Sequence, residues 1–159
     1  MQKMSSKQKP IAIGSDHGGF ITKLKIIEFL KKNGISIKDK GAKTLQIQDD
    51  YPPFANLVAR EISSKKTNYG ILLCRSGAGM CIAANKWRGV RAVNIHTTKE
   101  ALLARAHNNA NVVCISADTL SLTVIQKIIT IFLTTPFEGG RHKRRVDQIS
   151  ATEQRNFKK

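Results

Sequence analysis

A glycine-rich turn follows the most apolar segment of the chain. The segment YGILLC, from Tyr69 to Cys74, runs into RSGAGM, so the turn joins a predicted strand to a predicted helix. Backbone N–H groups at a helix start face the positive end of the helix dipole, where they can hold a phosphate or a developing oxyanion. The turn consists of Arg75, Ser76, Gly77, Ala78 and Gly79. Its residues are candidates for binding an anionic substrate.

Three familiar motifs of similar composition do not fit this turn. A dinucleotide-binding fingerprint needs a third glycine where Ile82 stands. A Walker loop needs Gly-Lys-Ser/Thr, which does not follow. A cysteine phosphatase needs an arginine six positions after its nucleophile, where this chain has Met80. The turn therefore belongs to some other chemistry.

Cys74 ends the predicted strand beside this turn. Backbone amides and a positive helix terminus favour a thiolate, which acts as a nucleophile or a base. A buried core cysteine is the alternative that the residue alone leaves open. The other cysteines, Cys81 and Cys114, lie in apolar sequence and form no C-x-x-C pair with each other or with Cys74. This usage predicts neither a disulfide framework nor a zinc site, and it fits a reducing cytoplasm.

Further candidates are histidines in polar segments and a pair of arginines. His17 and His107 suit acid–base or phosphate-binding roles because neither lies on an apolar face. Asp16 precedes His17 and either joins this chemistry or caps the following helix. Arg141 and Arg145 are four residues apart, so they share a helical face that either grips a phosphate or is simply solvated.

Short apolar runs alternate with amphipathic segments along the chain. The predicted strands are Lys9–Ser15, Ile35–Asp39, Tyr69–Cys74, Val90–Ile95 and Asn111–Ser116. The predicted helices are Phe20–Asn33, Pro52–Ser64, Cys81–Lys86, Lys99–His107 and Ser121–Leu133, with a basic terminal helix after Pro136. This alternation predicts an α/β fold with a doubly wound five-stranded parallel sheet. Ligands bind at the carboxyl edge of such sheets, and we expect residues 15–19, 74–79 and 107–109 to gather there.

Length and charge limit the number of domains and the other classes of function that the sequence allows. The 159 residues suit one domain, which we place at residues 11–159 behind a basic, mobile tail of residues 1–10. The longest apolar run, Leu120–Thr134, contains Gln126 and Lys127 and is too short for a membrane span, and the N-terminal residues do not read as a signal peptide. The net charge of +16 raises nucleic acid as a partner, but aromatic residues are only 6% and no nucleic-acid-binding motif is present. An anionic small substrate explains the charge as well.

Six ordered blocks of the sequence resemble type B ribose-5-phosphate isomerases. They are SDHGG (15–19), DYP (50–52), GILLCRSGAGMCIAANK (70–86), GVRA (89–92), ARAHNNANV (104–112) and FEGGRHKRRV (137–146). The resemblance runs from about Ile11 to Asn156. It implies a Rossmann-like fold and interconversion of ribose 5-phosphate and ribulose 5-phosphate through a cis-enediolate, with no metal or organic cofactor. It also implies homodimers, often paired into tetramers, whose active sites are built from both subunits.

The resemblance assigns catalytic roles by position. It implies that Cys74 is the base that moves a proton between C1 and C2, and that Ser76 moves protons between O1 and O2. The amides of residues 77–79 match the hole that holds the enediolate oxygen. His107 matches the acid that opens the furanose ring, with Asp16 as its counterpart.

Substrate-binding roles follow in the same way. His17, Arg141 and Arg145 match phosphate contacts, and Asn108 matches a contact to a sugar hydroxyl. Arg75, with the rest of the glycine turn, is counted among the residues expected to bind the substrate.

Two positions depart from the family's pattern. One branch of the family uses a glutamate as base at the position of Met80, so here Cys74 must take that role. Asp118 stands where the family usually has an arginine at the phosphate site. Because a carboxylate repels a phosphate, either Asp118 points away or another cation compensates.

Two other functions remain open from the sequence. One is isomerisation of a hexose 6-phosphate, of allose or galactose, since related chains share the fold and much of the turn. The other is a basic nucleic-acid-binding module on the same fold. The joint presence of Asp16, His17, Cys74, Ser76, His107, Arg141 and Arg145 argues against the module, which has no chemical need for all of them.

Overall fold

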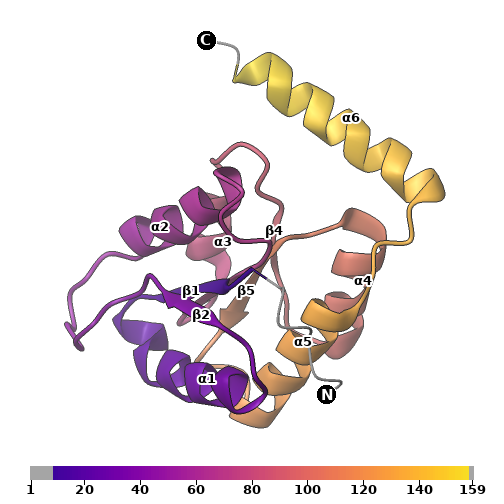
Figure 1. Ribbon diagram of the computed structural model, residues 1–159. Coiled ribbons are helices and arrows are strands. Elements are labelled where there is room, and N and C mark those ends of the chain that lie inside the picture. The colour runs from indigo at the N-terminus through magenta and orange to yellow at the C-terminus, as the bar shows by residue number, and fades with distance from the viewer. Residues whose placement is uncertain (1–8, 158–159) are drawn as a thin grey trace.

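Strands and helices alternate along the chain in the computed structural model, which describes residues 9–157 (Figure 1). Within that range the strands are β1 (Ile11–Ser15), β2 (Ile37–Asp39), β3 (Gly70–Cys74), β4 (Ala92–Asn94) and β5 (Val112–Ser116). The helices are α1 (Phe20–Lys32), α2 (Tyr51–Ser63), α3 (Ala78–Ala84), α4 (Thr98–Asn108), α5 (Leu122–Thr134) and α6 (Gly140–Asn156), with a short 3₁₀ helix η1 (His17–Gly19). Of the tail predicted at residues 1–10, only Lys9 and Pro10 are described, and the rest lies outside the described residues.

The sheet is parallel throughout, in the order β2-β1-β3-β5-β4. The chain first adds β2 on one side of β1 and then crosses to add β3 on the other side, so the winding reverses between β1 and β3. The doubly wound parallel sheet predicted from the sequence is confirmed. Ligand sites in such sheets lie outside the carboxyl ends of the strands at the point of reversal, here the ends of β1 and β3.

Helices cover both faces of the sheet. Successive side chains of a strand point to opposite faces, so Ile71 and Leu73 pack with α1, α4 and α5, whereas Leu72 and Cys74 pack with α2 and α3. Figure 1 shows α2 and α3 on one side of the sheet and α1 and α5 on the other. Every residue of β1, β3 and β5 is buried, as expected for central parallel strands, and these strands give the site a rigid floor.

Some element boundaries differ from those predicted. The helix expected at Cys81–Lys86 begins earlier, at Ala78, because the chain already enters helical geometry inside the glycine turn. The edge strands β2 and β4 have three residues each, shorter than their apolar runs, because each pairs with one neighbour only. The early start of α3 matters for function, since it places the helix terminus directly after Cys74.

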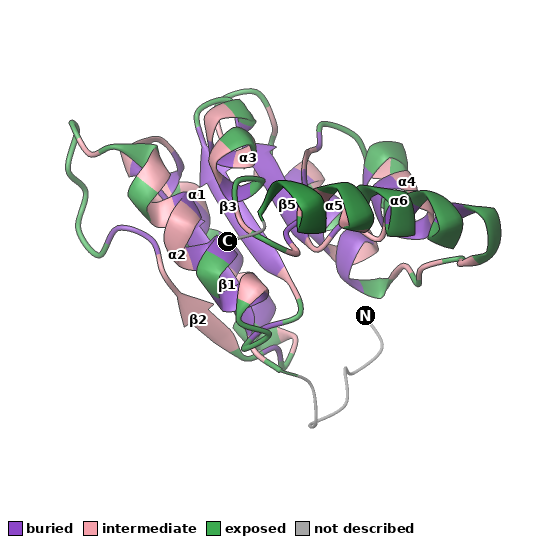
Figure 2. Ribbon diagram, turned by 90° about the horizontal axis from the view of Figure 1, so that it is seen from above, coloured by how far each residue is buried: buried purple, intermediate pink, exposed green. Residues whose placement is uncertain are grey.

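Helix α6 stands apart from the sheet and from the helices that cover its two faces. Among its residues only His142 and Val146 are buried, and Figure 2 shows the helix exposed along most of its length. The segment that leads into it lies against the end of α4, where the Glu138 N–H donates to the Ala106 carbonyl at 3.0 Å. None of the helices in the described part of the chain is both long and apolar enough to cross a membrane.

Candidate active site

The end of β1 places Asp16 and His17 at the carboxyl edge of the sheet. The buried Asp16 side chain accepts a hydrogen bond from the Gly19 N–H at 3.1 Å and caps η1. Burial raises the pKa of Asp16 above its ordinary value, although the Gly19 hydrogen bond and the nearby His17 oppose the shift. Both sequence readings of Asp16 are therefore compatible, since the residue caps the helix and also holds a perturbed carboxyl group at the site.

His17 is held by a residue that the sequence did not single out. Asp49 Oδ1 accepts a hydrogen bond from the His17 backbone N–H at 2.8 Å and lies 2.7 Å from His17 Nδ1. Asp49 comes from the loop before α2, 32 residues along the chain. No local signal identifies such a contact, because loop carboxylates are common and the pairing depends on how that loop folds back.

The end of β3 places Cys74 against the glycine turn. The Gly77 N–H donates to Cys74 Sγ at 3.0 Å, and the Cys74 side chain is buried. Gly77 has φ +80°, which lets the chain turn back toward the sulfur before α3 begins. A Cβ at Gly77 would lie 2.3 Å from Asn94 Oδ1, so a larger residue does not fit without movement. The turn thus directs one amide at the thiol.

The amides that follow are free to face a ligand. The first helical hydrogen bond of α3 runs from the Cys81 N–H to the Gly77 carbonyl at 3.1 Å. The N–H groups of residues 78–80 precede it and have no partner within the helix. The Ala78 N–H makes only a long contact of 3.4 Å to Ser76 Oγ, and Ser76 is itself exposed. Ser76 and the amides of Ala78 and Gly79 therefore follow Cys74 closely at the carboxyl end of β3.

The Asp118 carboxylate has a cation beside it, the guanidinium of Arg75. Arg75 Nη1 lies 3.8 Å from Asp118 Oδ2, and the Asp118 N–H donates to the Arg75 carbonyl at 3.4 Å. Both side chains are more than half exposed, at 71% and 52%, so the ion pair contributes little to stability. Its relevance is electrostatic, because the guanidinium offsets the carboxylate charge at this edge.

Four of the predicted site residues lie away from Cys74, at the opposite edge of the sheet. They are His107, Asn108, Arg141 and Arg145. We expected residues 107–109 at the carboxyl edge, and this was wrong. Helix α4 runs antiparallel to the strands, so its last residues, just before β5, lie at the amino edge. There the Asn109 carbonyl accepts from Arg91 Nε at 2.9 Å, and the Asn111 carbonyl accepts from the first amide of β3 at 2.9 Å. At about 3.3 Å per residue, a five-residue strand separates the two edges by roughly 13 Å.

These four residues form a second group where α4 meets α6. The His107 and His142 rings stack with centroids 4.0 Å apart and planes 5° apart. Both Nε2 atoms lie near Glu138 Oε2, at 3.6 Å from His107 and 3.7 Å from His142. Burial lowers the pKa of His142, and the neighbouring His107 and Arg141 lower it further, so a neutral ring is favoured. Sequence reasoning missed Glu138 and His142 as neighbours of His107.

The side chains of His107, Glu138 and His142 are the candidate metal ligands in the described part of the chain. Their ligand atoms all lie within 4.8 Å of one another. Arg141 Nε lies 3.4 Å from His142 Nε2, however, and a guanidinium so close opposes a second cation. The charge of the cluster suits an anion better than a metal ion.

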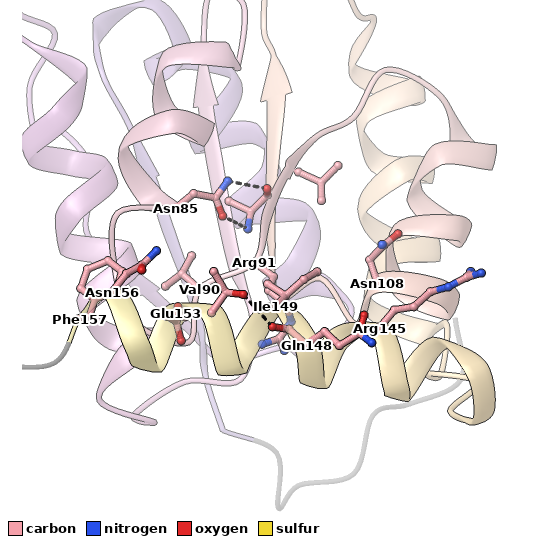
Figure 3. A pocket seen from close by; sticks show the side chains of 13 residues that line it. Asn85, Val90, Arg91, Asn108, Arg145, Gln148, Ile149, Glu153, Asn156 and Phe157 are labelled. Carbon is pink, nitrogen blue, oxygen red and sulfur yellow. Dashed lines mark hydrogen bonds between the residues drawn. The ribbon is translucent and has the colours of Figure 1, made fainter.

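A groove of about 730 Å³ runs between α6 and the β4 side of the amino edge. Figure 3 shows Asn108 and Arg145 at one end of it and Asn156 and Phe157 at the other. Val90, Ile149 and Phe157 give it an apolar side. None of the residues that line this groove belongs to the group around Cys74.

The fold and the two groups define a doubly wound α/β protein with a thiol and backbone amides at the switch point of its sheet and a cationic cluster at the opposite edge. A family model described as Ribose/Galactose Isomerase matches residues 11–149. The chain belongs to the ribose/galactose isomerase family.

Individual relatives match along nearly their whole length. The chain is 44% identical over 140 residues to a probable ribose-5-phosphate isomerase B of Mycoplasma genitalium, covering 87% of this chain and 92% of the relative. It is 40% identical over 147 residues to ribose-5-phosphate isomerase B of Escherichia coli, covering 92% and 98%. A crystal structure of the M. genitalium isomerase with bound ribulose-5-phosphate superposes with a TM-score of 0.88 at 43% identity, covering 91% of this chain and 96% of that one.

Proposed function

We infer that the chain is an aldose–ketose isomerase that interconverts D-ribose 5-phosphate and D-ribulose 5-phosphate. The observation that carries this conclusion is the full-length similarity to ribose-5-phosphate isomerases B, one of them solved with ribulose-5-phosphate bound. The thiol and the backbone amides at the start of α3 supply groups that the reaction requires.

We assign Cys74 as the base. The Cys74 thiolate takes the proton from C2 of the open-chain aldose, and the electron pair of that bond moves into a cis-enediolate. The same sulfur returns the proton to C1, which gives the ketose with no net change in protons or electrons. Gly77 N–H, at 3.0 Å, stabilises the sulfur when it is charged.

The enediolate oxygen needs donors other than Gly77. Because the Gly77 N–H already bonds to Cys74 Sγ, the role falls to the amides of Ala78 and Gly79 at the start of α3. Ser76 Oγ stands beside them and moves a proton between O1 and O2. This refines the prediction from the sequence, in which Gly77 shared the oxyanion role.

We propose that the functional unit is a homodimer with shared sites. His107, Asn108, Arg141 and Arg145 lie at the opposite edge of the sheet from Cys74, and the last three are exposed. A two-fold axis pairs the Cys74 edge of one copy with the cationic cluster of the other, and it does so twice. Each complete site then contains Cys74 from one copy and the ring-opening acid His107 from its partner copy.

The phosphate contacts follow from this arrangement. His17 lies at the Cys74 edge, and Arg141 and Arg145 reach it from the second copy. The energy of binding the phosphate, away from the reacting carbons, positions C1 and C2 against the Cys74 sulfur. Arg75 offsets the charge of Asp118, so the aspartate at the usual arginine position does not act as an uncompensated repulsive charge.

We also propose the limits of the domain and the location of the protein in the cell. We take residues 11–159 as the isomerase domain, of which 11–149 match the family model. The thiols of Cys74, Cys81 and Cys114 are free, which suits the reducing cytoplasm where we place the protein.

The direct test is turnover of ribose 5-phosphate, allose 6-phosphate and galactose 6-phosphate by the purified protein with EDTA present. The proposal requires the fastest conversion on the pentose, and conversion that survives the chelator. Preference for a hexose phosphate reassigns the substrate within the family. No turnover on any of the three sugar phosphates contradicts the proposal that the chain is an isomerase. A nucleic-acid titration at varied salt concentration is then the next experiment.

A further inference from the structure

One carboxylate holds His17 from two sides. Asp49 Oδ1 accepts from the His17 backbone N–H and contacts ring Nδ1, at 2.8 and 2.7 Å. The Asp49 side chain is 10% exposed, and its second oxygen is buried with no partner among the residues that the structure describes. The Asp49 side chain is therefore directed at His17 and not at solvent.

The contact at Nδ1 fixes the ring. A carboxylate only accepts hydrogen bonds, so a 2.7 Å contact of this kind places a proton on Nδ1. The other ring nitrogen, Nε2, is then left for a second partner. Because the backbone N–H of the same residue is bound to the same oxygen, the ring cannot turn away without losing the contact.

The loop that carries Asp49 is itself anchored beside the site. The Lys23 ammonium is fully buried, donates to the Ala42 carbonyl at 2.6 Å and pairs with Asp39 at 3.1 Å. The Ala42 N–H donates to the carbonyl of Ser15, the last residue of β1, at 3.1 Å. The far end of the loop runs into α2. Both ends are held, so Asp49 reaches His17 from a defined direction.

We propose that Asp49 is a positioning residue for the substrate's phosphate. It holds the His17 ring so that Nε2 faces the anion, and substrate affinity depends on that orientation. The assignment rests on the proposed function, in which His17 contacts the phosphate. Among the described residues the Asp49 side chain bonds to His17 and not to Cys74, so it acts on affinity and not on proton transfer at carbon.

Two substitutions and a neighbouring control test the role. Asp49→Ala removes both contacts, whereas Asp49→Asn keeps an oxygen that can accept from both N–H groups. Asp50→Ala is the control, because Asp50 is an exposed carboxylate on the same loop whose side chain makes no capping hydrogen bond to α2. Thermal unfolding of all three variants establishes that they are folded before kinetics are compared.

The expected result is a split between KM and kcat. In Asp49→Ala, KM for ribose 5-phosphate rises about tenfold while kcat stays within about twofold, and the inhibition constant of inorganic phosphate rises in parallel. Asp49→Asn restores KM to within about threefold, and Asp50→Ala matches the wild-type enzyme. Long-range ¹H–¹⁵N spectra of the imidazoles show a proton on Nδ1 of His17 in the wild type and a changed pattern in Asp49→Ala.

Other outcomes overturn the proposal. An unchanged KM in Asp49→Ala excludes the role, and a loss confined to kcat assigns Asp49 to the chemical step instead. A His17 spectrum that is identical in the wild type and in Asp49→Ala shows that the contact does not set the ring. A wild-type protein without turnover refutes the proposed function itself, and that failure is visible before any variant is made.

Discussion

The Gly77 amide donates a hydrogen bond to Cys74 Sγ at 3.0 Å, across the turn that joins β3 to α3. This contact links the sequence pattern to the chemistry, because it explains why a glycine follows the cysteine by three positions. With φ at +80°, Gly77 turns its N–H back to the sulfur, and the helix then starts at the next residue. The proposed base and the proposed oxyanion donors are thus held by one turn.

Replacement of Gly77 by alanine is expected to reduce kcat by about 100-fold, because a Cβ would lie 2.3 Å from Asn94 Oδ1 and displace the turn that positions the base. Gly34→Ala is the matched control. Gly34 has nearly the same φ, +76°, but nothing lies within 4 Å of its Cβ position. Steady-state kinetics and thermal unfolding of both variants separate backbone strain from loss of the site. Equal activity in the two variants contradicts the role of the turn.

The Cys74→Ala variant is expected to lose turnover while its affinity for inorganic phosphate stays within about tenfold of the wild type, because the thiol acts at carbon and not at the phosphate. Isothermal titration and turnover assays measure the two properties. Cys81→Ala is the control, since Cys81 lies in α3 and its Sγ contacts the Ala92 carbonyl at 3.3 Å, away from the turn amides. Full activity in Cys74→Ala refutes the assignment of the base.

Much of the fold was predictable because its signals are local. The apolar runs that became β1, β3 and β5 and the glycine turn after Cys74 identified the parallel sheet and one edge of the site. The polar residues next to those runs indicated where ligands bind. Each of these inferences needs only a short window of sequence.

The remainder of the site could not be predicted from local sequence. It depends on which edge of the sheet a segment occupies and on contacts between residues far apart in the chain. His107 was placed at the wrong edge because polarity marks a segment as functional but does not say which end of a strand it occupies. The chain order shows it, since a residue just before a parallel strand lies at the amino edge. The Asp49 contact to His17 spans 32 residues through an irregular loop and leaves no pattern to find.

Asp16 is expected to lower stability at neutral pH. Burial raises its pKa in the folded state above the ordinary value of 3.8, so between these two values the folded protein binds more protons than the unfolded chain. Stability from this group is therefore present below 3.8 and is lost as pH rises through the folded-state pKa. Asp16→Asn keeps an acceptor for the Gly19 N–H and removes the charge. Urea unfolding should show the variant more stable than the wild type at pH 7, with the difference shrinking toward pH 4, and turnover reduced. A variant that is less stable at pH 7 contradicts the argument.

The proposed sharing of each site between two subunits makes a quantitative prediction for mixed dimers. Cys74→Ala removes the proposed base and His107→Ala removes the proposed ring-opening acid, so each variant alone is expected to be nearly inactive. In a heterodimer, one site combines both substitutions and the other combines the intact Cys74 of one copy with the intact His107 of its partner. Equal amounts of the two variants, unfolded together and refolded, give half heterodimers with one working site in two, so about a quarter of wild-type activity should return. Two batches of Cys74→Ala treated in the same way provide the control. If the mixture stays inactive while sedimentation shows refolded dimers, His107 and Cys74 do not meet across the two-fold axis.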